Sequence, residues 1–226
     1  MTAKAPGFTN PNRSDSFSFR RMAMCILGVV ISGITVGMFK HAALGIDPFQ
    51  TLMAGLDAVI PIRFGTLYVI ANAVLLLFAL CTDRHKIGLG TLVNLFLLGY
   101  IAEFTMAVLK RIMPSPGFSA RLILLVITIV ILCLATSLYF TADLGVSPYD
   151  AVALIWSQRQ NKIPFFACRV ICDFACVLLG TILCRIAGFS LGKITEVVGI
   201  GTIITAFFMG PLIDFFNRHI SKPLLK

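Results

Sequence analysis

Two side chains of opposite charge stand four residues apart in an apolar stretch of this chain. Arg169 and Asp173 occupy one face of the helix predicted over residues 167–183. In a bilayer, an unpaired charge near the helix centre costs at least about 2.5–3.5 kcal/mol. The two groups are therefore expected to pair or to face the interior of a helix bundle. They form either part of a solute or ion site or a buried structural pair. Asn72 adds a polar group at the matching position of the first half.

A turn motif occurs once in each half of the chain. Residues 44–49 read Leu-Gly-Ile-Asp-Pro-Phe, and residues 144–149, located 100 positions later, read Leu-Gly-Val-Ser-Pro-Tyr. The glycine can end a helix in a left-handed conformation, and the Asp or Ser followed by Pro is typical of a capped helix start. The capping candidates are Asp47 and Pro48 in the first copy and Ser147 and Pro148 in the second.

Two capped helix starts would frame a polar site if they met. A helix N-terminus carries free N–H groups and about half a positive charge, which favours anions. The alternative is an ordinary tight turn at the membrane surface. Asp143 and Asp150 flank the second turn, whereas Ala43 and Gln50 flank the first. The second copy is thus the more acidic, as a site for one asymmetric ligand would require.

A second motif also recurs in both halves. Residues 88–91 read Gly-Leu-Gly-Thr and residues 199–202 read Gly-Ile-Gly-Thr, at an offset of 111 that also places Glu103 onto Asp214. Small residues allow close helix packing in lipid, which is the expected role of these glycines. Glu103 and Asp214 are either interfacial acids paired with the nearby Lys110 and Arg218 or a proton or cation site.

Composition predicts an integral membrane protein. Hydrophobic residues make up 58% of the chain, charged residues 13%, and the mean hydropathy is +0.94. Soluble domains average about 45–50% apolar and about 25% charged residues. Six apolar runs approach or reach the roughly 17–25 residues that cross a bilayer. These runs are 22–39, 67–81, 89–109, 122–142, 170–184 and 197–216. We therefore predict an all-α, polytopic transmembrane helix bundle in contact with the lipid bilayer.

The net charge of +9 does not indicate a nucleic-acid partner. Lys and Arg flank the apolar runs, as the positive-inside rule predicts, and do not form one basic face. Residues 1–18 are polar and lack the pattern of a cleavable signal peptide, so they are predicted to form a disordered cytoplasmic tail.

Residues 19–112 and 113–226 are predicted to form two tandem four-helix repeats with short second and sixth helices. If the short helices cross, there are eight crossings with both halves in one orientation. Of the Lys and Arg residues counted, twelve then lie on the N-terminal side of the membrane and five on the opposite side. If they are re-entrant, there are six crossings with inverted halves, and the division is ten against seven. The larger bias favours eight crossings of the cytoplasmic (inner) membrane with both termini cytoplasmic. Thirteen residues reach only about 20 Å, short of a hydrocarbon core of about 30 Å.

No residue pattern predicts a metal, a cofactor or a catalytic set. Three of the seven cysteines, Cys168, Cys172 and Cys176, recur along one helix face, while the three histidines stand at span ends elsewhere. Packing is the expected role of these cysteines. Because no Ser-His-acid set, zinc signature or phosphate-binding loop occurs, an enzyme is disfavoured.

The two duplicated motifs, Leu-Gly-x-x-Pro-[Phe/Tyr] and Gly-x-Gly-Thr, resemble those of the YczE/YyaS/YitT family of bacterial membrane proteins over residues 20–218. The chain is nearer the YczE branch, since no soluble C-terminal domain follows. The resemblance implies a multi-pass protein of the cytoplasmic membrane whose molecular activity is largely unassigned. Ser147 stands where the first copy has Asp47, so only one of the two turns carries an acidic cap.

Three functions agree with these observations. The first is a small secondary transporter or exporter of an unknown solute or ion, with a polar site between the repeats. The second is a scaffold or regulator that assists another membrane or biosynthetic protein, for which a membrane-protein partner or a homodimer is the expected contact. The third is an intramembrane enzyme, for which no residue selects a reaction.

Overall fold

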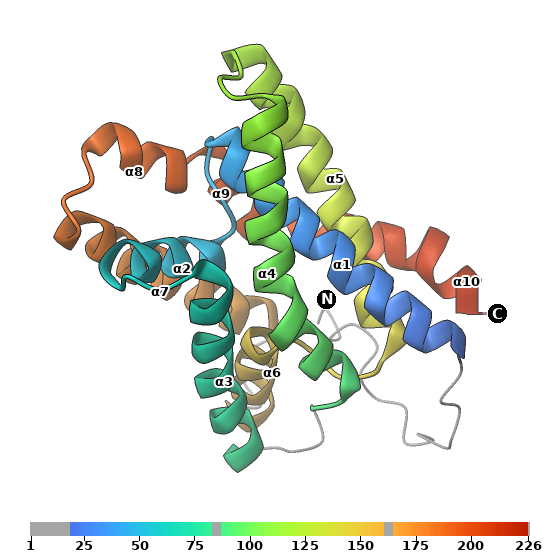
Figure 1. Cartoon of the computed structure of the whole chain (residues 1–226). Coiled ribbons are helices and arrows are strands. Elements are labelled where there is room, and N and C mark those ends of the chain that lie inside the picture. The colour runs from blue at the N-terminus through green and yellow to red at the C-terminus, as the bar shows by residue number, and fades with distance from the viewer. Residues whose placement is uncertain (1–18, 83–86, 161–164, 226) are drawn as a thin grey trace.

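The chain folds into helices throughout the residues that the structure describes. The computed structural model describes residues 19–82, 87–160 and 165–225, and no strand occurs among them. In chain order the helices are α1 (Phe19–Ala42), α2 (Pro48–Val59), α3 (Phe64–Thr82), α4 (Leu89–Ile112), α5 (Phe118–Ala142), α6 (Pro148–Gln160), α7 (Phe165–Ile186), α8 (Leu191–Val197), α9 (Ile200–Phe216), a π-helical turn (Asn217–Ser221) and α10 (Lys222–Leu225). The predicted all-α class is confirmed (Figure 1). The tail predicted at 1–18 lies outside the described residues.

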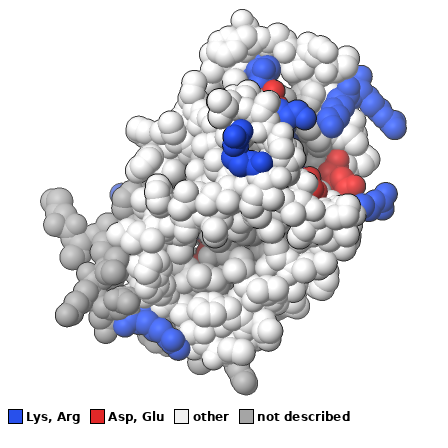
Figure 2. Space-filling model, turned by 90° about the vertical axis from the view of Figure 1, so that its left-hand side faces the viewer, with Lys and Arg blue, Asp and Glu red and all other residues white. Residues whose placement is uncertain are grey.

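Six helical segments in the described part of the chain are long and apolar enough to cross a membrane. They are Phe19–Ala42, Phe64–Thr82, Leu89–Ile112, Phe118–Ala142, Ala167–Ile186 and Leu191–Leu225. Large apolar side chains stand exposed on them, for example Val74 at 65% and Phe174 at 69%. Figure 2 shows, on one face, a broad band without Lys, Arg, Asp or Glu between charged groups at either end. Such a surface suits hydrocarbon, so the chain is a multi-pass membrane protein in contact with lipid.

Helices α1 and α5 pack along each other in opposite directions. At the start of α1, Arg21 Nη1 donates to the Ala142 carbonyl at the end of α5 over 3.4 Å. At the start of α5, Arg121 Nε donates to the Ala42 carbonyl at the end of α1 over 2.6 Å, and its Nη2 donates to the Ala43 carbonyl. Each arginine thus supplies a partner to carbonyl groups that a helix C-terminus leaves without one.

The prediction that both halves share one orientation is wrong. Eight crossings would make α5 parallel to α1 and α4 antiparallel to it, and the structure has the reverse. Helix α4 runs parallel to α1, because Gly33 lies against the Leu98 carbonyl and Gly37 against the Ala102 carbonyl. The short helices α2 and α6 contain 12 and 13 residues, so each extends only about 18–20 Å. This length is short of a hydrocarbon core of about 30 Å, whereas the six long segments are long enough to cross it.

Each of the two turns docks on the glycine motif of the other half. The Leu44 carbonyl accepts a hydrogen bond from Gly201 N at 2.9 Å, and Ile46 N donates to the Val197 carbonyl at 3.0 Å. In the same way, the Leu144 carbonyl accepts from Gly90 N at 2.8 Å. These bonds join segments more than 50 residues apart and satisfy backbone groups that would otherwise be costly inside a membrane. The repeat boundary at residue 112 stays a prediction.

The two short helices also pack on long helices of the other half. Helix α2 lies along α7, where a Cβ on Gly55 would stand 2.6 Å from the Gly180 carbonyl. Helix α6 lies against α3, where Ala79 belongs to the same buried cluster as Ala151 and Ile155. Small residues at both crossings let the backbones approach closely. The halves are therefore interlocked and do not form separate bundles.

A labelling experiment distinguishes six crossings from eight. With six, the loop that holds Ser115 lies on the opposite side of the membrane from the C-terminus, and with eight it lies on the same side. In a variant without the exposed Cys81, single cysteines introduced as Ser115→Cys and Lys222→Cys are treated with a membrane-impermeant maleimide on intact cells. We expect one of the two to be labelled, and both only after permeabilisation. Equal labelling of both on intact cells would restore the eight-crossing arrangement.

Candidate functional site

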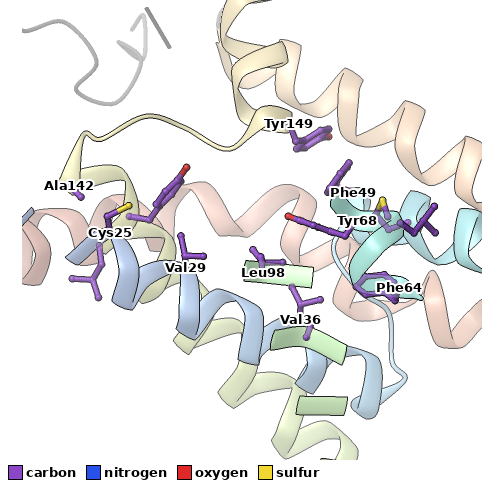
Figure 3. Packing of buried hydrophobic residues seen from close by; sticks show 14 of the residues in the cluster. Cys25, Val29, Val36, Phe49, Phe64, Tyr68, Leu98, Ala142 and Tyr149 are labelled. Atoms are coloured by element: carbon purple, nitrogen blue, oxygen red, sulfur yellow. The ribbon is translucent and has the colours of Figure 1, made fainter. Parts of the chain in front are cut away.

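Helices α2 and α6 begin beside each other in the interior of the bundle. Pro48 and Pro148 are their first residues. The rings of the next residues, Phe49 and Tyr149, stack with centroids 4.8 Å apart and planes inclined by 22°. Tyr68 of α3 packs edge-on against Phe49 with centroids 6.0 Å apart, as Figure 3 illustrates. The two turns therefore meet, and the positive ends of two helix dipoles lie at one place.

Side chains cap both helix starts. Asp47 Oδ1 accepts hydrogen bonds from Phe49 N at 3.1 Å and from Gln50 N at 3.3 Å. Ser147 Oγ accepts from Asp150 N at 3.1 Å and donates to Asp150 Oδ2 at 2.6 Å. The first cap is an acid and the second a hydroxyl that is itself held by an acid. Both turns thus deliver a carboxylate to the meeting point.

A buried ion cluster adjoins the start of α6. Arg169 Nη1 contacts Asp150 Oδ1, and Arg169 Nε lies 3.3 Å from Asp173 Oδ1. The Tyr149 hydroxyl donates to Asp173 Oδ1 at 2.5 Å, while the guanidinium Cζ stands 4.6 Å from the centroid of the Tyr149 ring. Asp173 is only 5% exposed. The structure therefore pairs Arg169 with two carboxylates, of which that of Asp173 is the more deeply buried.

The cluster carries more negative than positive charge. Asp47 caps α2 beside Phe49, whose ring stacks on that of Tyr149 at the cluster. Two carboxylates, those of Asp150 and Asp173, thus contact one guanidinium, and a third, that of Asp47, lies at the adjoining helix start. The two helix N-termini offset part of the difference, since each contributes roughly half a positive charge. A proton or a bound cation would offset the rest.

Amides line the other side of the meeting point. The Asn72 Nδ2 donates to the Tyr68 carbonyl at 2.9 Å, and the Tyr68 hydroxyl donates to Asn94 Oδ1 at 3.4 Å. Gln50 Oε1 and Asn72 Oδ1 are buried and accept no hydrogen bond within the described parts of the chain. A buried acceptor without a donor costs about 1–3 kcal/mol. These two oxygens are free to accept from a ligand or a water.

Three of the predicted site residues lie away from the cluster. Asp143 ends α5 in a left-handed conformation with φ of 52°. Glu103 accepts from Gly65 N and stands 3.9 Å from Arg63. Asp214 pairs with Arg218 at 2.6 Å on an exposed face. Of the two alternatives for this acid, the structure thus shows the pairing with a nearby base. The cluster is formed by the other predicted residues, with Asn72 close to Tyr68.

Sequence reasoning did not select three residues that the structure adds to the site. They are Tyr68, Tyr149 and Gln50. Tyr149 ends the turn motif, so the motif itself signalled it. Gln50 occupies the position that Asp150 has in the second half, and Tyr68 occupies that of Arg169. The comparison of the halves set Gln50 against Asp150 without selecting it, and the same comparison extended to Tyr68 would have set it against Arg169.

Comparisons with known proteins agree with a membrane family. The family described as of unknown function, DUF6198, matches residues 19–218. An uncharacterized protein of Haemophilus influenzae is 27% identical over 90% of this chain and 86% of its own length. The uncharacterized protein YyaS of Bacillus subtilis is 25% identical over 88% of this chain and 93% of its own length. The YyaS match confirms the predicted resemblance without distinguishing the YczE branch. No solved structure matches.

Proposed function

This chain belongs to the DUF6198 family, and we propose that it is a small secondary transporter with one polar site where α2 and α6 begin. The observation that carries the proposal is the meeting of two helix N-termini at a buried ion cluster inside a membrane bundle. Broken or short helices whose N-termini converge near mid-membrane are typical of transporter substrate sites. A structural ion pair alone would not require two helix starts from distant parts of the chain.

The arrangement of the halves supports the same proposal. Because α1 and α5 are antiparallel and each turn docks on the glycine motif of the other half, we propose an inverted repeat with re-entrant α2 and α6. Movement of one half against the other would then open the site to each side in turn. We place the protein in the inner membrane with both termini cytoplasmic.

The charges of the cluster suggest coupling to a proton or a cation. Two carboxylates contact one arginine and a third lies at the adjoining helix start, and a proton or a cationic occupant is favoured where negative charge is in excess. Asp173 is the coupling group in this proposal, because it links the Arg169 guanidinium to the Tyr149 hydroxyl at the start of α6, where a cation or a proton would compete with Arg169 for the carboxylate. Protonation of Asp173 would weaken its ion pair with Arg169 and release the guanidinium.

Solute-driven proton movement in proteoliposomes tests the proposal. Purified protein is reconstituted with an internal pH-sensitive dye, and single amino acids, sugars, organic acids, Na⁺ and K⁺ are added in turn. We expect one solute class to produce a proton flux that falls at least about tenfold in Asp173→Asn. Asp214→Asn is the matched control, because this aspartate lies on an exposed face and should leave the flux unchanged.

Absence of flux from folded, monodisperse protein with every solute would overturn the transporter. If, in addition, a protein partner copurified in a stable stoichiometric complex, the scaffold function would be favoured.

A further inference from the structure

A cavity of about 470 Å³ lies apart from the ion cluster, among the C-terminal parts of α1, α2 and α4. Its volume falls within the roughly 300–1,000 Å³ that small-molecule sites occupy. Most of its lining residues are apolar, among them Ala54, Ala102 and Met106. Five charged side chains also face it. They are Lys40, Asp57, Glu103, Lys110 and Glu196.

The cavity holds an ammonium group without an ion-pair partner. Lys40 Nζ lies over the Phe64 ring, 2.9 Å from the centroid. Asp57 and Glu103 act on it electrostatically, yet within the described residues neither carboxylate comes within ion-pair distance of it. Glu103 instead accepts from Gly65 N at 3.3 Å. Opposite charges therefore face each other across the cavity and are not joined by a contact.

The cavity adjoins the turn that leads into the central site. Ile46 and Val197 both line it, and Ile46 N donates to the Val197 carbonyl at 3.0 Å. Asp47, the cap of α2, follows Ile46 directly. The docked turn thus contributes both to the wall of the cavity and, through Asp47, to the cap of α2.

We propose that this cavity binds a small zwitterion with an apolar body. Its anionic group contacts Lys40, its ammonium group lies near Asp57 and Glu103, and its apolar part packs on the alanine and methionine wall. An anion alone would leave Asp57 without an ion-pair partner, and a cation alone would leave Lys40 unpaired. This binding proposal adds a substrate class to the proposed transporter function. It rests on that function only for the transport of the solute after binding. A free amino acid and a phosphatidylethanolamine headgroup share this chemistry.

Equilibrium binding of L-leucine to the purified full-length protein tests the site. In detergent free of phosphatidylethanolamine, we expect saturable binding of L-leucine and at least about tenfold weaker binding of leucinamide, which lacks the carboxylate, and of 4-methylpentanoate, which lacks the ammonium group. Lys40→Met should weaken L-leucine binding at least about tenfold, and Asp57→Asn should weaken it as well. Lys222→Met is the control, because Lys222 is an exposed lysine near the C-terminus that does not line the cavity.

A second arm identifies the source of the zwitterion. Protein in nanodiscs of phosphatidylglycerol alone is titrated with phosphatidylethanolamine, and retention of that lipid by wild type but not by Lys40→Met would assign the site to a headgroup. If folded wild type retained neither probe, or if Lys40→Met bound both unchanged, the proposal would be overturned. Binding of L-leucine without flux in proteoliposomes would contradict only the transporter. Flux of another solute without zwitterion binding would contradict only this inference.

Discussion

Replacing Arg169 with alanine is expected to lower the free energy of unfolding by about 3–5 kcal/mol, as breaking a buried ion pair does. The side chain contacts Asp150 and Asp173, and both carboxylates are largely shielded, with side-chain exposures of 15% and 7%. Without the guanidinium, two negative charges would remain close together away from water. Unfolding of the purified protein in detergent, followed by thermal melting and by steric trapping, measures the loss.

The control for this variant lies on the same helix. Arg185→Ala removes an exposed arginine that donates to the Phe189 carbonyl at 3.2 Å, and it should change the unfolding free energy by no more than about 0.5 kcal/mol. Adding Asp150→Asn and Asp173→Asn to Arg169→Ala should recover part of the loss, because the amides carry no charge. Equal effects of Arg169→Ala and Arg185→Ala would show that the cluster does not stabilise the fold.

The local chemistry of the site was readable from the sequence. A small polar residue before proline predicted capped helix starts at Asp47 and Ser147, and the four-residue spacing predicted that Arg169 and Asp173 share a face. Both follow from interactions within one or two helical turns. Asp150 was selected for its acidity alone, and its contact with Arg169 depends on how α6 and α7 pack.

The orientation of the halves could not be predicted from charge counting. Arg63 and Arg121 were counted as topological signals, although each has a partner within the fold. Arg121 satisfies the carbonyls at the end of α1, and Arg63 faces Glu103. A positive charge with a structural partner gives no information about the side of the membrane. The length of the short helices, which argued against a full crossing, was the better signal.

The glycine motif on which each turn docks could not be predicted from the sequence either. Both halves carry the same two motifs, so a turn could have docked on the glycine motif of its own half or on that of the other. Residues 44–46 contact the segment around Gly199, and Leu144 contacts Gly90. Which glycine motif a turn contacts depends on packing between distant segments. Two nearly identical motifs do not distinguish one possibility from the other. The predicted role of the glycines in close packing did not require this knowledge.

Replacing Gly145 with alanine is expected to prevent folding or to lower the free energy of unfolding by more than about 4 kcal/mol, at the exceptional end for single substitutions. Gly145 has φ of 110°, and a Cβ there would stand 2.5 Å from Gly88 N and 2.7 Å from Thr91 Oγ1. The nearest atom is backbone and cannot rotate away. The fraction of folded protein after extraction, followed by size-exclusion chromatography and thermal melting, measures the effect.

Gly188→Ala separates the clash from the backbone strain. Gly188 also has a left-handed φ, of 81°, but a Cβ there would meet nothing within 4 Å. This variant should therefore lose only the roughly 1–2 kcal/mol of left-handed strain. The excess loss in Gly145→Ala would then measure how strongly the second turn depends on close contact with Gly88. If both variants lost the same amount, strain alone would explain Gly145, and the docking of the turns would not hold the halves together.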